Sequence, residues 1–265
     1  MESLQARLEA QLQKLAFPKH RIIMVHARLR GLQQCTRLSY PALSQQIKAA
    51  LLSFQPYSIL IPAYTITSFR MGRIFHRLYS HAETGRFSEE LRLSGMPRTS
   101  DPVYSLLDSH NYLAQQSCLN SPCCFGKNSV FAHLYCNNAV ILNIDMPGFW
   151  STLIHQLEWQ QQVPYRQLKM LSGQIYHNAT NHQLINYPAY LRKLNQHGVM
   201  QPFYDQKKRL DFLQSKGILR EDSQQNISLR WTYAQNLMQV LEPELDNNPY
   251  FLISQQQSPD FPWLT

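Results

Sequence analysis

The residues best suited to chemistry lie near the middle of the chain, where His155 and Glu158 follow an apolar stretch. They are three positions apart, so on a helix they share one face and can contact each other or a common substrate. A neutral imidazole is the usual general base near pH 7, and a nearby carboxylate can hold its tautomer and stabilise its charged form. A helix histidine with satisfied hydrogen bonds beside a solvated glutamate has the same spacing, so the pair alone leaves both interpretations open.

The stretch that carries this pair predicts a strand, a turn and a helix in succession. Residues 139–144 form an apolar run, which is typical of a strand covered on both faces. Residues 146–148, Met-Pro-Gly, then predict a turn into the helix. Ligands of open α/β sheets gather beyond the carboxyl ends of such strands. We therefore expect the active site at the end of this strand.

The first part of the chain favours a parallel sheet. Residues 2–16 predict an amphipathic helix, 21–25 a core strand, 40–54 a helix and 57–61 a second strand. A strand, a helix and a second strand in this order are typical of a βαβ unit, which makes the two strands parallel.

The rest of the chain predicts further helices and one small hairpin. The hairpin is expected from strands 165–170 and 174–178, joined through Ser172 and Gly173. Helices are expected at 87–93, from Asn128 or Ser129 onward, at 203–216 and at 232–240. The long polar segment 64–105 predicts a binding wall, because such an insert after a core strand is usually functional. No interdomain linker is evident, so residues 1–265 are expected to form a single domain that includes this insert.

Length and composition are those of an ordinary globular protein. A chain of 265 residues with 44% hydrophobic content can bury a substantial core. No apolar run approaches the length of a membrane span, and the polar first helix predicts neither a signal peptide nor an anchor. Five cysteines without CxxC spacing are expected to be reduced packing residues of a cytoplasmic protein, with a catalytic thiol or a metal site as alternatives.

Charge and motifs narrow the possible partners. The formal charge of +8 favours a polyanionic partner such as a nucleotide, a phosphorylated cofactor or an acidic surface. The basic residues are scattered without interleaved aromatic residues, so nucleic acid is not expected. GxGxxG, GxxxxGK[ST], HExxH and GxSxG are all absent, and there are only nine glycines, so neither a common phosphate-binding loop nor a metal site is expected.

Seven segments, in order along the chain, resemble the aminoglycoside 3-N-acetyltransferase family. They are similar most closely to its branch of acyltransferases that act on nucleotide-linked amino sugars for surface polysaccharides. The segments are MVHARL (24–29), IPAYT (61–65), ETGRFSE (83–89), RTSDPVYS (98–105), NSVFA (128–132), TLIHQLE (152–158) and NPYFL (248–252). The chain departs from the antibiotic-modifying relatives at Asp101 before Pro102, where they carry His-Pro, at Arg28 in place of serine, and at Phe149 in place of asparagine.

The resemblance implies a three-layer α/β/α sandwich with a largely parallel central sheet, a coenzyme A thioester as acyl donor and transfer to a primary amine. By this match His155 would deprotonate the amine, Glu158 would orient His155 or hold the amine, and Thr65 or a nearby backbone amide would steady the oxyanion. The residues that would bind the donor are His26, Ala27, Arg28, Leu29, Asn128, Ser129 and Thr152. Those that would bind the acceptor are Tyr64, Arg86, Asp101, Tyr104 and Ser105.

Three functions therefore compete. The preferred one is N-acylation of a nucleotide-linked amino sugar, because the basic segment 64–105 suits an anionic acceptor better than a polycationic drug. The second is aminoglycoside acetylation, as in antibiotic resistance. The third is a catalytically degenerate binding or assembly protein. A homodimer is a further possibility that composition does not test.

Overall fold

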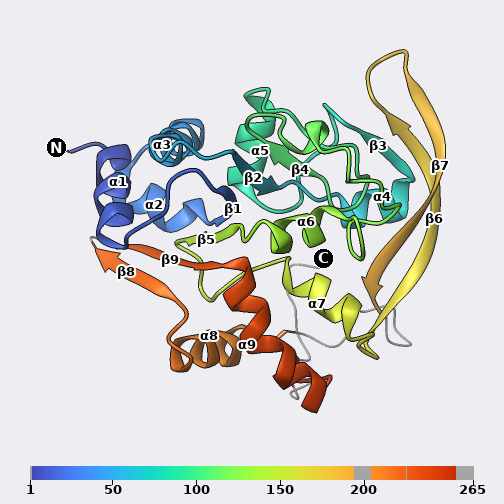
Figure 1. Ribbon diagram of the computed structural model, residues 1–265. Helices are drawn as coiled ribbons and strands as arrows, with labels where there is room; N and C mark the ends of the chain where they lie inside the picture. The colour runs from blue at the N-terminus through green and yellow to red at the C-terminus, as the bar shows by residue number, and fades with distance from the viewer. Residues whose placement is uncertain (1, 194–203, 225, 255–265) are drawn as a thin grey trace.

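The computed structural model describes residues 2–193, 204–224 and 226–254 (Figure 1). Within these residues the main sheet has six strands in the order β4-β2-β1-β5-β9-β8. The central strands β2, β1 and β5 run parallel, whereas β4, β9 and β8 pair antiparallel with their neighbours. The strands are β1 (Ile22–Ala27), β2 (Ser58–Pro62), β4 (Leu106–Asp108), β5 (Val140–Ile144), β8 (Arg220–Gln224) and β9 (Ile227–Tyr233).

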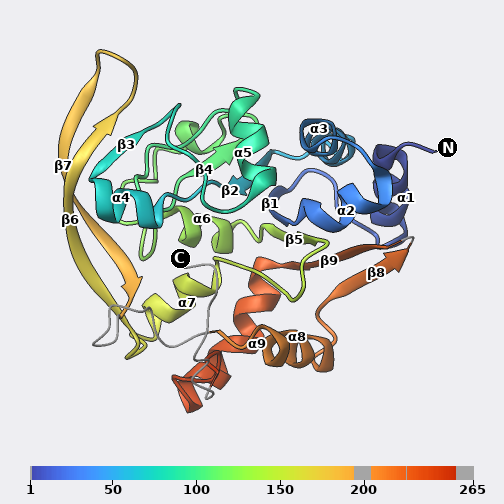
Figure 2. The same cartoon turned by 180° about the vertical axis from the view of Figure 1, so that it is seen from behind.

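Apolar side chains cover both faces of the main sheet, which makes the fold three-layered. Alternate residues of one strand enter different cores: in β1, Ile22 and Met24 belong to one cluster, whereas Ile23 and Val25 belong to the other. One cluster is completed by α1 (Leu4–Lys14), α2 (Leu29–Thr36), α3 (Tyr40–Leu52) and α5 (Arg86–Leu93). The other is completed by α4 (Ile66–Gly72), α6 (Val130–Cys136), α7 (Ile154–Gln160), α8 (Gln206–Ser215) and α9 (Ala234–Asn247). Figures 1 and 2 show these layers from opposite sides and confirm the predicted α/β sandwich.

A second sheet of three strands stands at one end of the molecule (Figure 1). It consists of β3 (Ile74–His76), β6 (Arg166–Tyr176) and β7 (His182–Arg192), with β6 and β7 forming a long antiparallel hairpin. A hairpin was predicted here, but its turn was wrong. Ser172 and Gly173 lie in the middle of β6, and the chain reverses at residues 177–181, where the Asn178 side chain accepts the backbone N–H of Asn181.

Gly173 explains this error. A Cβ atom at this position would lie 2.6 Å from the carbonyl oxygen of Arg73 and 2.6 Å from the Phe69 ring. The glycine therefore allows β6 to pack closely against the end of α4, a role that glycine has in strands as well as in turns.

Most of the predicted elements have nearly the expected bounds. Ser129 caps α6 by accepting the backbone N–H of Ala132, and Asp205 caps α8 in the same way through Lys208. Residue 203, the predicted start of α8, lies outside the described residues. The antiparallel pair β8 and β9 was not predicted. Within the described ranges, no helix is both long and apolar enough to cross a bilayer.

The cysteines fit the sequence prediction only in part. Cys123 and Cys124 are buried, as expected of packing residues, but the other three are exposed. In the described part of the chain all five are free thiols, and no group of histidine, cysteine and acidic side chains is arranged to hold a metal ion.

Candidate active site

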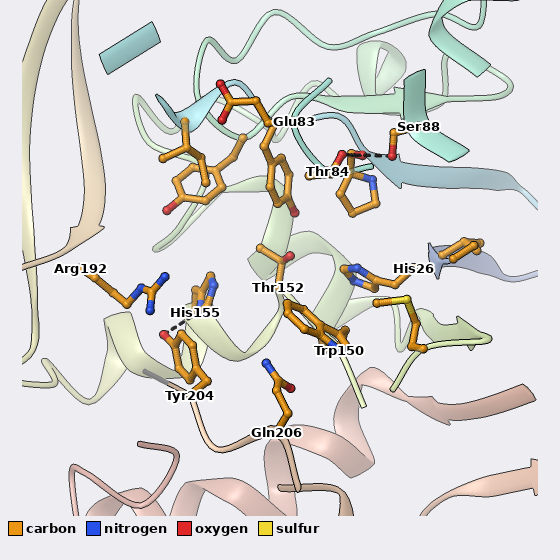
Figure 3. A pocket seen from close by; sticks show the side chains of 18 of the residues that line it. His26, Glu83, Thr84, Ser88, Trp150, Thr152, His155, Arg192, Tyr204 and Gln206 are labelled. Carbon is orange, nitrogen blue, oxygen red and sulfur yellow. Dashed lines mark hydrogen bonds between the residues drawn. The ribbon is translucent and has the colours of Figure 1, made fainter. Parts of the chain in front are cut away.

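A cavity of about 470 Å³ lies beyond the carboxyl ends of β1, β2 and β5. His26 and Ala27 end β1, Pro62 ends β2, and Met146 follows β5. Parallel strands bring their carboxyl ends to one edge of a sheet, which is the place where α/β folds bind ligands. Figure 3 shows His26 at the end of β1 and Trp150 after β5 on one side of this space, with Thr84 and Glu83 across from them. The residues that line the cavity include Tyr64, Glu83, Thr84, Tyr104, Trp150, Thr152, His155, Arg166, Arg192, Tyr204 and Arg209.

His155 and Glu158 form a hydrogen-bonded pair on α7. The Nδ1 atom of His155 lies 2.8 Å from Oε2 of Glu158, which is the contact that their spacing on a helix predicts. Because Nδ1 donates to the carboxylate, the neutral ring keeps its lone pair on Nε2. No hydrogen bond between described residues engages Nε2, and His155 lines the cavity. This geometry is that of a general base held by an acid.

Glu158 is fully buried and is held by four donors. Besides His155, its carboxylate accepts the hydroxyls of Tyr165 at 2.8 Å and Tyr204 at 2.7 Å, and it pairs with Nε of Arg166 at 2.6 Å. Burial alone would raise the pKa of Glu158, but the charge of Arg166 and the contact with His155 outweigh it and lower the pKa to about 2. The carboxylate therefore stays ionised in the interior.

Both histidines of the cavity are neutral at pH 7. Burial lowers the pKa of His155 to about 4, assisted by the positive charge of Arg166 and opposed by Glu158. Burial also lowers the pKa of His26 to about 3, assisted by Arg209 and His155. The Nε2 atom of His26 is buried and has no hydrogen-bond partner among the described residues. A neutral imidazole can either accept or donate, so His26 offers the cavity one unused polar group.

The predicted donor-binding residues divide into three groups. His26, Ala27 and Thr152 line the cavity, as Figure 3 shows for the first and last of them. Arg28 lies just outside, at a smaller hollow that it shares with Arg30 and Met146. The remaining three lie elsewhere: Leu29 is buried in the apolar core, and Asn128 and Ser129 line a second cavity of about 440 Å³.

Thr65 does not face the main cavity. It is fully buried, its hydroxyl donates to the carbonyl of Pro102 at 2.6 Å, and its backbone N–H donates to Val103. Both of its donors are thus occupied, so the structure does not bring this residue to the position of an oxyanion. The reason is that the backbone turns after β2, so that Tyr64 and Ile66 face the cavity while Thr65 points toward the 98–105 segment.

Two of the predicted acceptor-binding residues, Tyr64 and Tyr104, line the main cavity. The carboxylate of Asp101 accepts the backbone N–H groups of Val103 and Tyr104, the turn-forming role common before proline. Ser105 is buried and donates to the carbonyl of Ala63.

Arg86 is not brought to the cavity either, because it pairs with Glu90 along α5. The segment 64–105 nevertheless supplies part of the wall of the cavity, through Tyr64, Glu83, Thr84, Ser88 and Tyr104.

Sequence reasoning missed the arginines and the tyrosine that complete the site. Arg166 and Arg192 lie at the paired ends of β6 and β7, and Tyr204 and Arg209 come from the segment that enters α8. Tyr204 packs against His155, with ring centroids 5.6 Å apart (Figure 3). These residues are far from His155 in sequence and match no motif, so no local signal identifies them.

Phe149 has a structural role. It is fully buried in the apolar core and is not among the residues that line the cavity. Its neighbour Trp150 lines the cavity, and Asn143 of β5 holds the Trp150 backbone by two hydrogen bonds, at 2.8 and 2.6 Å. The side chain that departs from the family pattern therefore packs in the core and is not part of the described cavity wall.

The α/β/α sandwich thus places a partly buried histidine, paired with a buried glutamate, at the carboxyl ends of its parallel strands, an arrangement suited to general-base catalysis. The model of the family described as aminoglycoside 3-N-acetyltransferase matches residues 24–245. The chain belongs to this family and is an N-acyltransferase enzyme, as its motifs predict. None of the curated protein sequences compared with the chain matches it significantly.

Solved structures share the fold at low sequence identity. AAC-IIIb, solved as a binary complex with CoASH, is 18% identical with a TM-score of 0.70, over 92% of this chain and 97% of that one. A mutant of AAC(3)-IVa in complex with a gentamicin is 14% identical with a TM-score of 0.69, over 95% and 92%. The YokD protein from Bacillus subtilis is 14% identical with a TM-score of 0.68, over 92% and 99%. These likenesses support the predicted fold.

Proposed function

We propose that this protein transfers an acyl group from a coenzyme A thioester to the primary amine of an amino sugar, with His155 as general base. One observation supports this most directly: His155 is neutral, bonded through Nδ1 to the ionised Glu158, and has Nε2 unengaged at the cavity. A base of this kind can take a proton from an attacking amine at Nε2 while its Nδ1–H stays bonded to the carboxylate.

In the proposed reaction, the amine nitrogen forms a bond to the acyl carbon and the carbon–sulfur bond breaks. His155 accepts the amine proton at Nε2 and returns a proton to the leaving thiolate, so that protons balance. Glu158 stabilises the imidazolium that forms between these two steps. Thr152 and the unpartnered Nε2 of His26 line the same cavity and are the candidates to donate to the developing oxyanion, in place of Thr65.

The donor fits the side of the cavity where β1 ends. The hollow beside Met146 carries Arg28 and Arg30, both exposed, and it adjoins the main cavity through that methionine. Exposed arginines suit the phosphates of a coenzyme, because a guanidinium binds them with two parallel hydrogen bonds. A bound thioester would supply the activated acyl carbon. One relative of the same fold was solved with CoASH.

Two kinds of acceptor remain candidates. The relative solved with a gentamicin and the family name both favour an aminoglycoside. The charge of the cavity favours a different amino sugar: Arg166, Arg192 and Arg209 line it, whereas Glu83 is the only carboxylate among the described residues that line it. A nucleotide-linked amino sugar, the preferred interpretation of the sequence, suits such a wall.

A thiol-release assay tests the proposed function. Acetyl-CoA and 3-hydroxybutyryl-CoA are each offered with aminoglycosides, nucleotide-linked amino sugars and simple amino sugars. We expect turnover with at least one acceptor and a loss of about 10³-fold or more in kcat for His155→Ala.

The outcomes separate the candidates. Turnover of nucleotide-linked sugars alone selects that acceptor, and turnover of aminoglycosides alone selects the antibiotic-modifying function. Folded protein that releases no thiol and binds no coenzyme A in calorimetry would contradict acyl transfer altogether. Full activity in His155→Ala would contradict the assignment of the base.

A further inference from the structure

A buried arginine that pairs with no carboxylate of the described residues lines the main cavity. Arg209 lies in the first turns of α8 and exposes only 4% of its surface. One terminal nitrogen donates to the side-chain oxygen of Gln206, but Nε is buried and has no hydrogen-bond partner among the described residues. Burial lowers the pKa of Arg209 only to about 10, so the guanidinium remains charged at neutral pH.

The contrast with Arg166 shows what Arg209 lacks. Arg166 is equally buried, but it pairs with Glu158 and donates to Tyr190 and Tyr204. No ion pair joins Arg209 to a carboxylate of the described residues. An unpaired buried charge is strongly destabilising. A charge kept in this state at a ligand cavity indicates an anion that binds there.

Other charges near Arg209 do not supply this anion. Asp205 caps α8 through the backbone of Lys208. Glu83, on the 64–105 wall, accepts the backbone N–H groups of Thr67 and Ser68 at the start of α4. The Glu158 carboxylate is shared among its four donors. Glu158 and Asp205 attract the Arg209 guanidinium through longer-range electrostatics and form no direct ion pair with it.

Arg209 is also close to the catalytic base. Its guanidinium carbon lies 6.0 Å from the centre of the Tyr204 ring, and the His155 ring lies 5.6 Å from the same centre. Arg192 approaches this ring to 5.3 Å. Arg209 and His155 thus approach the same ring and line the same cavity, so an anion at Arg209 would share that cavity with the reacting amine. The phosphates of coenzyme A are separated from its sulfur by the long neutral pantetheine arm, which places them farther out, where Arg28 and Arg30 are exposed.

We propose that Arg209 binds an acidic group, a carboxylate or a phosphate, carried by the acceptor itself, so that the acceptor is an acidic amino sugar. This inference rests on the proposed acyl transfer and narrows its acceptor class. It also gives a reason for the arginines that line the cavity. Arg209 would repel polycationic amines, whereas an acidic amino sugar would neutralise its charge.

Inorganic phosphate is a probe that does not depend on knowing the acceptor. We expect wild-type protein to gain about 3 °C in Tm at a phosphate concentration ten times its Kd. Arg209→Met should melt higher than wild type in phosphate-free buffer and lose most of this gain. Arg166→Met is the matched control and should melt lower, because it leaves the buried Glu158 carboxylate without its guanidinium partner. The proposal would be overturned if Arg209→Met kept the full phosphate-induced gain in Tm and its Tm in phosphate-free buffer was equal to or lower than that of wild type.

Saturating coenzyme A distinguishes the source of the anion. If it abolishes the part of the phosphate response that depends on Arg209, the subsite belongs to the donor and the proposal is wrong. We expect that part to persist.

Activity gives a second, independent readout. Glucosamine 6-phosphate should exceed glucosamine by about tenfold or more in kcat/KM, and Arg209→Met should remove this preference. Turnover of both sugars without a preference would refute the acidic acceptor while leaving acyl transfer intact. Absence of turnover with any amine would refute acyl transfer, and the phosphate response would still decide the role of Arg209.

Discussion

The site depends on the different environments of His155 and Glu158. Glu158 accepts four hydrogen bonds or ion-pair contacts from residues of α7, β6 and the segment before α8, and it has no exposed surface. His155 uses Nδ1 for Glu158 and turns its other nitrogen to the cavity. The carboxylate thus determines the tautomer of the base and stabilises it when it becomes charged.

Glu158→Gln should lower kcat by about 10³-fold, because the amide favours no single tautomer and carries no charge to balance the imidazolium. Steady-state kinetics with the acceptor identified by thiol release would measure the effect. KM for the acyl donor should change little. A loss smaller than tenfold would show that Glu158 is structural and not a partner in proton transfer.

The acid side of the pH–rate profile is also determined by this pair. The pKa of His155 is lowered to about 4, so the base is neutral throughout the range above pH 6. We expect the acid limb of kcat to lie well below pH 6, and any limb at higher pH to come from the acceptor amine. A limb near the ordinary histidine pKa of about 6.5 would contradict the buried environment described for His155.

At the scale of elements, the long hairpin positions the partners of Glu158. Arg166 begins β6, and Tyr165 precedes it, so the docking of this strand determines where both side chains meet the carboxylate. β6 is anchored at its other end by pairing with β3, and Gly173 passes closest to the end of α4. A change at Gly173 therefore acts on the site through the strand.

Gly173→Ala should destabilise the protein by about 2 kcal/mol, because its methyl group would lie within 3 Å of the Arg73 carbonyl and the Phe69 ring. Thermal unfolding should show a Tm lower by about 4 to 8 °C.

Gly72→Ala is the matched control for this change. A Cβ at Gly72 meets nothing within 4 Å, and the residue ends α4 beside the same contact. The Tm of Gly72→Ala should be unchanged or slightly raised, because alanine has a higher helix propensity than glycine. Equal effects of the two changes would show that the close packing at Gly173 does not limit stability.

At the scale of the whole molecule, two neutral, partly buried histidines make folding sensitive to acid. Below about pH 6.5 the unfolded chain binds a proton on each of them, whereas the folded protein does so only near pH 4 for His155 and pH 3 for His26. The folded state therefore binds fewer protons, and the free energy of unfolding falls as the pH falls through this window.

Each histidine should contribute a slope of about 1.4 kcal/mol per pH unit between pH 6 and pH 5. Urea unfolding of wild type and of His155→Gln at several pH values measures this slope. The slope of the variant should be smaller by about the contribution of one histidine. Parallel pH dependences for the two proteins would show that His155 titrates normally in the fold.

The sequence determined the local features of this protein. The apolar run of residues 139–144, the helix spacing of His155 and Glu158, and the cap at Ser129 depend on contacts within a few residues, and each predicted element is present in the fold. The ordered motifs likewise identified the family, because a motif depends on residue type and order alone.

Only the tertiary structure decided which side chains meet at the cavity. Thr65 lies in a predicted motif, yet it faces Pro102, because the path of the chain after β2 sets its direction. Arg166, Tyr204 and Arg209 reach the site from a hairpin and a helix far along the chain. Their positions result from the packing of elements distant in sequence, and no periodicity or spacing within one segment carries that information.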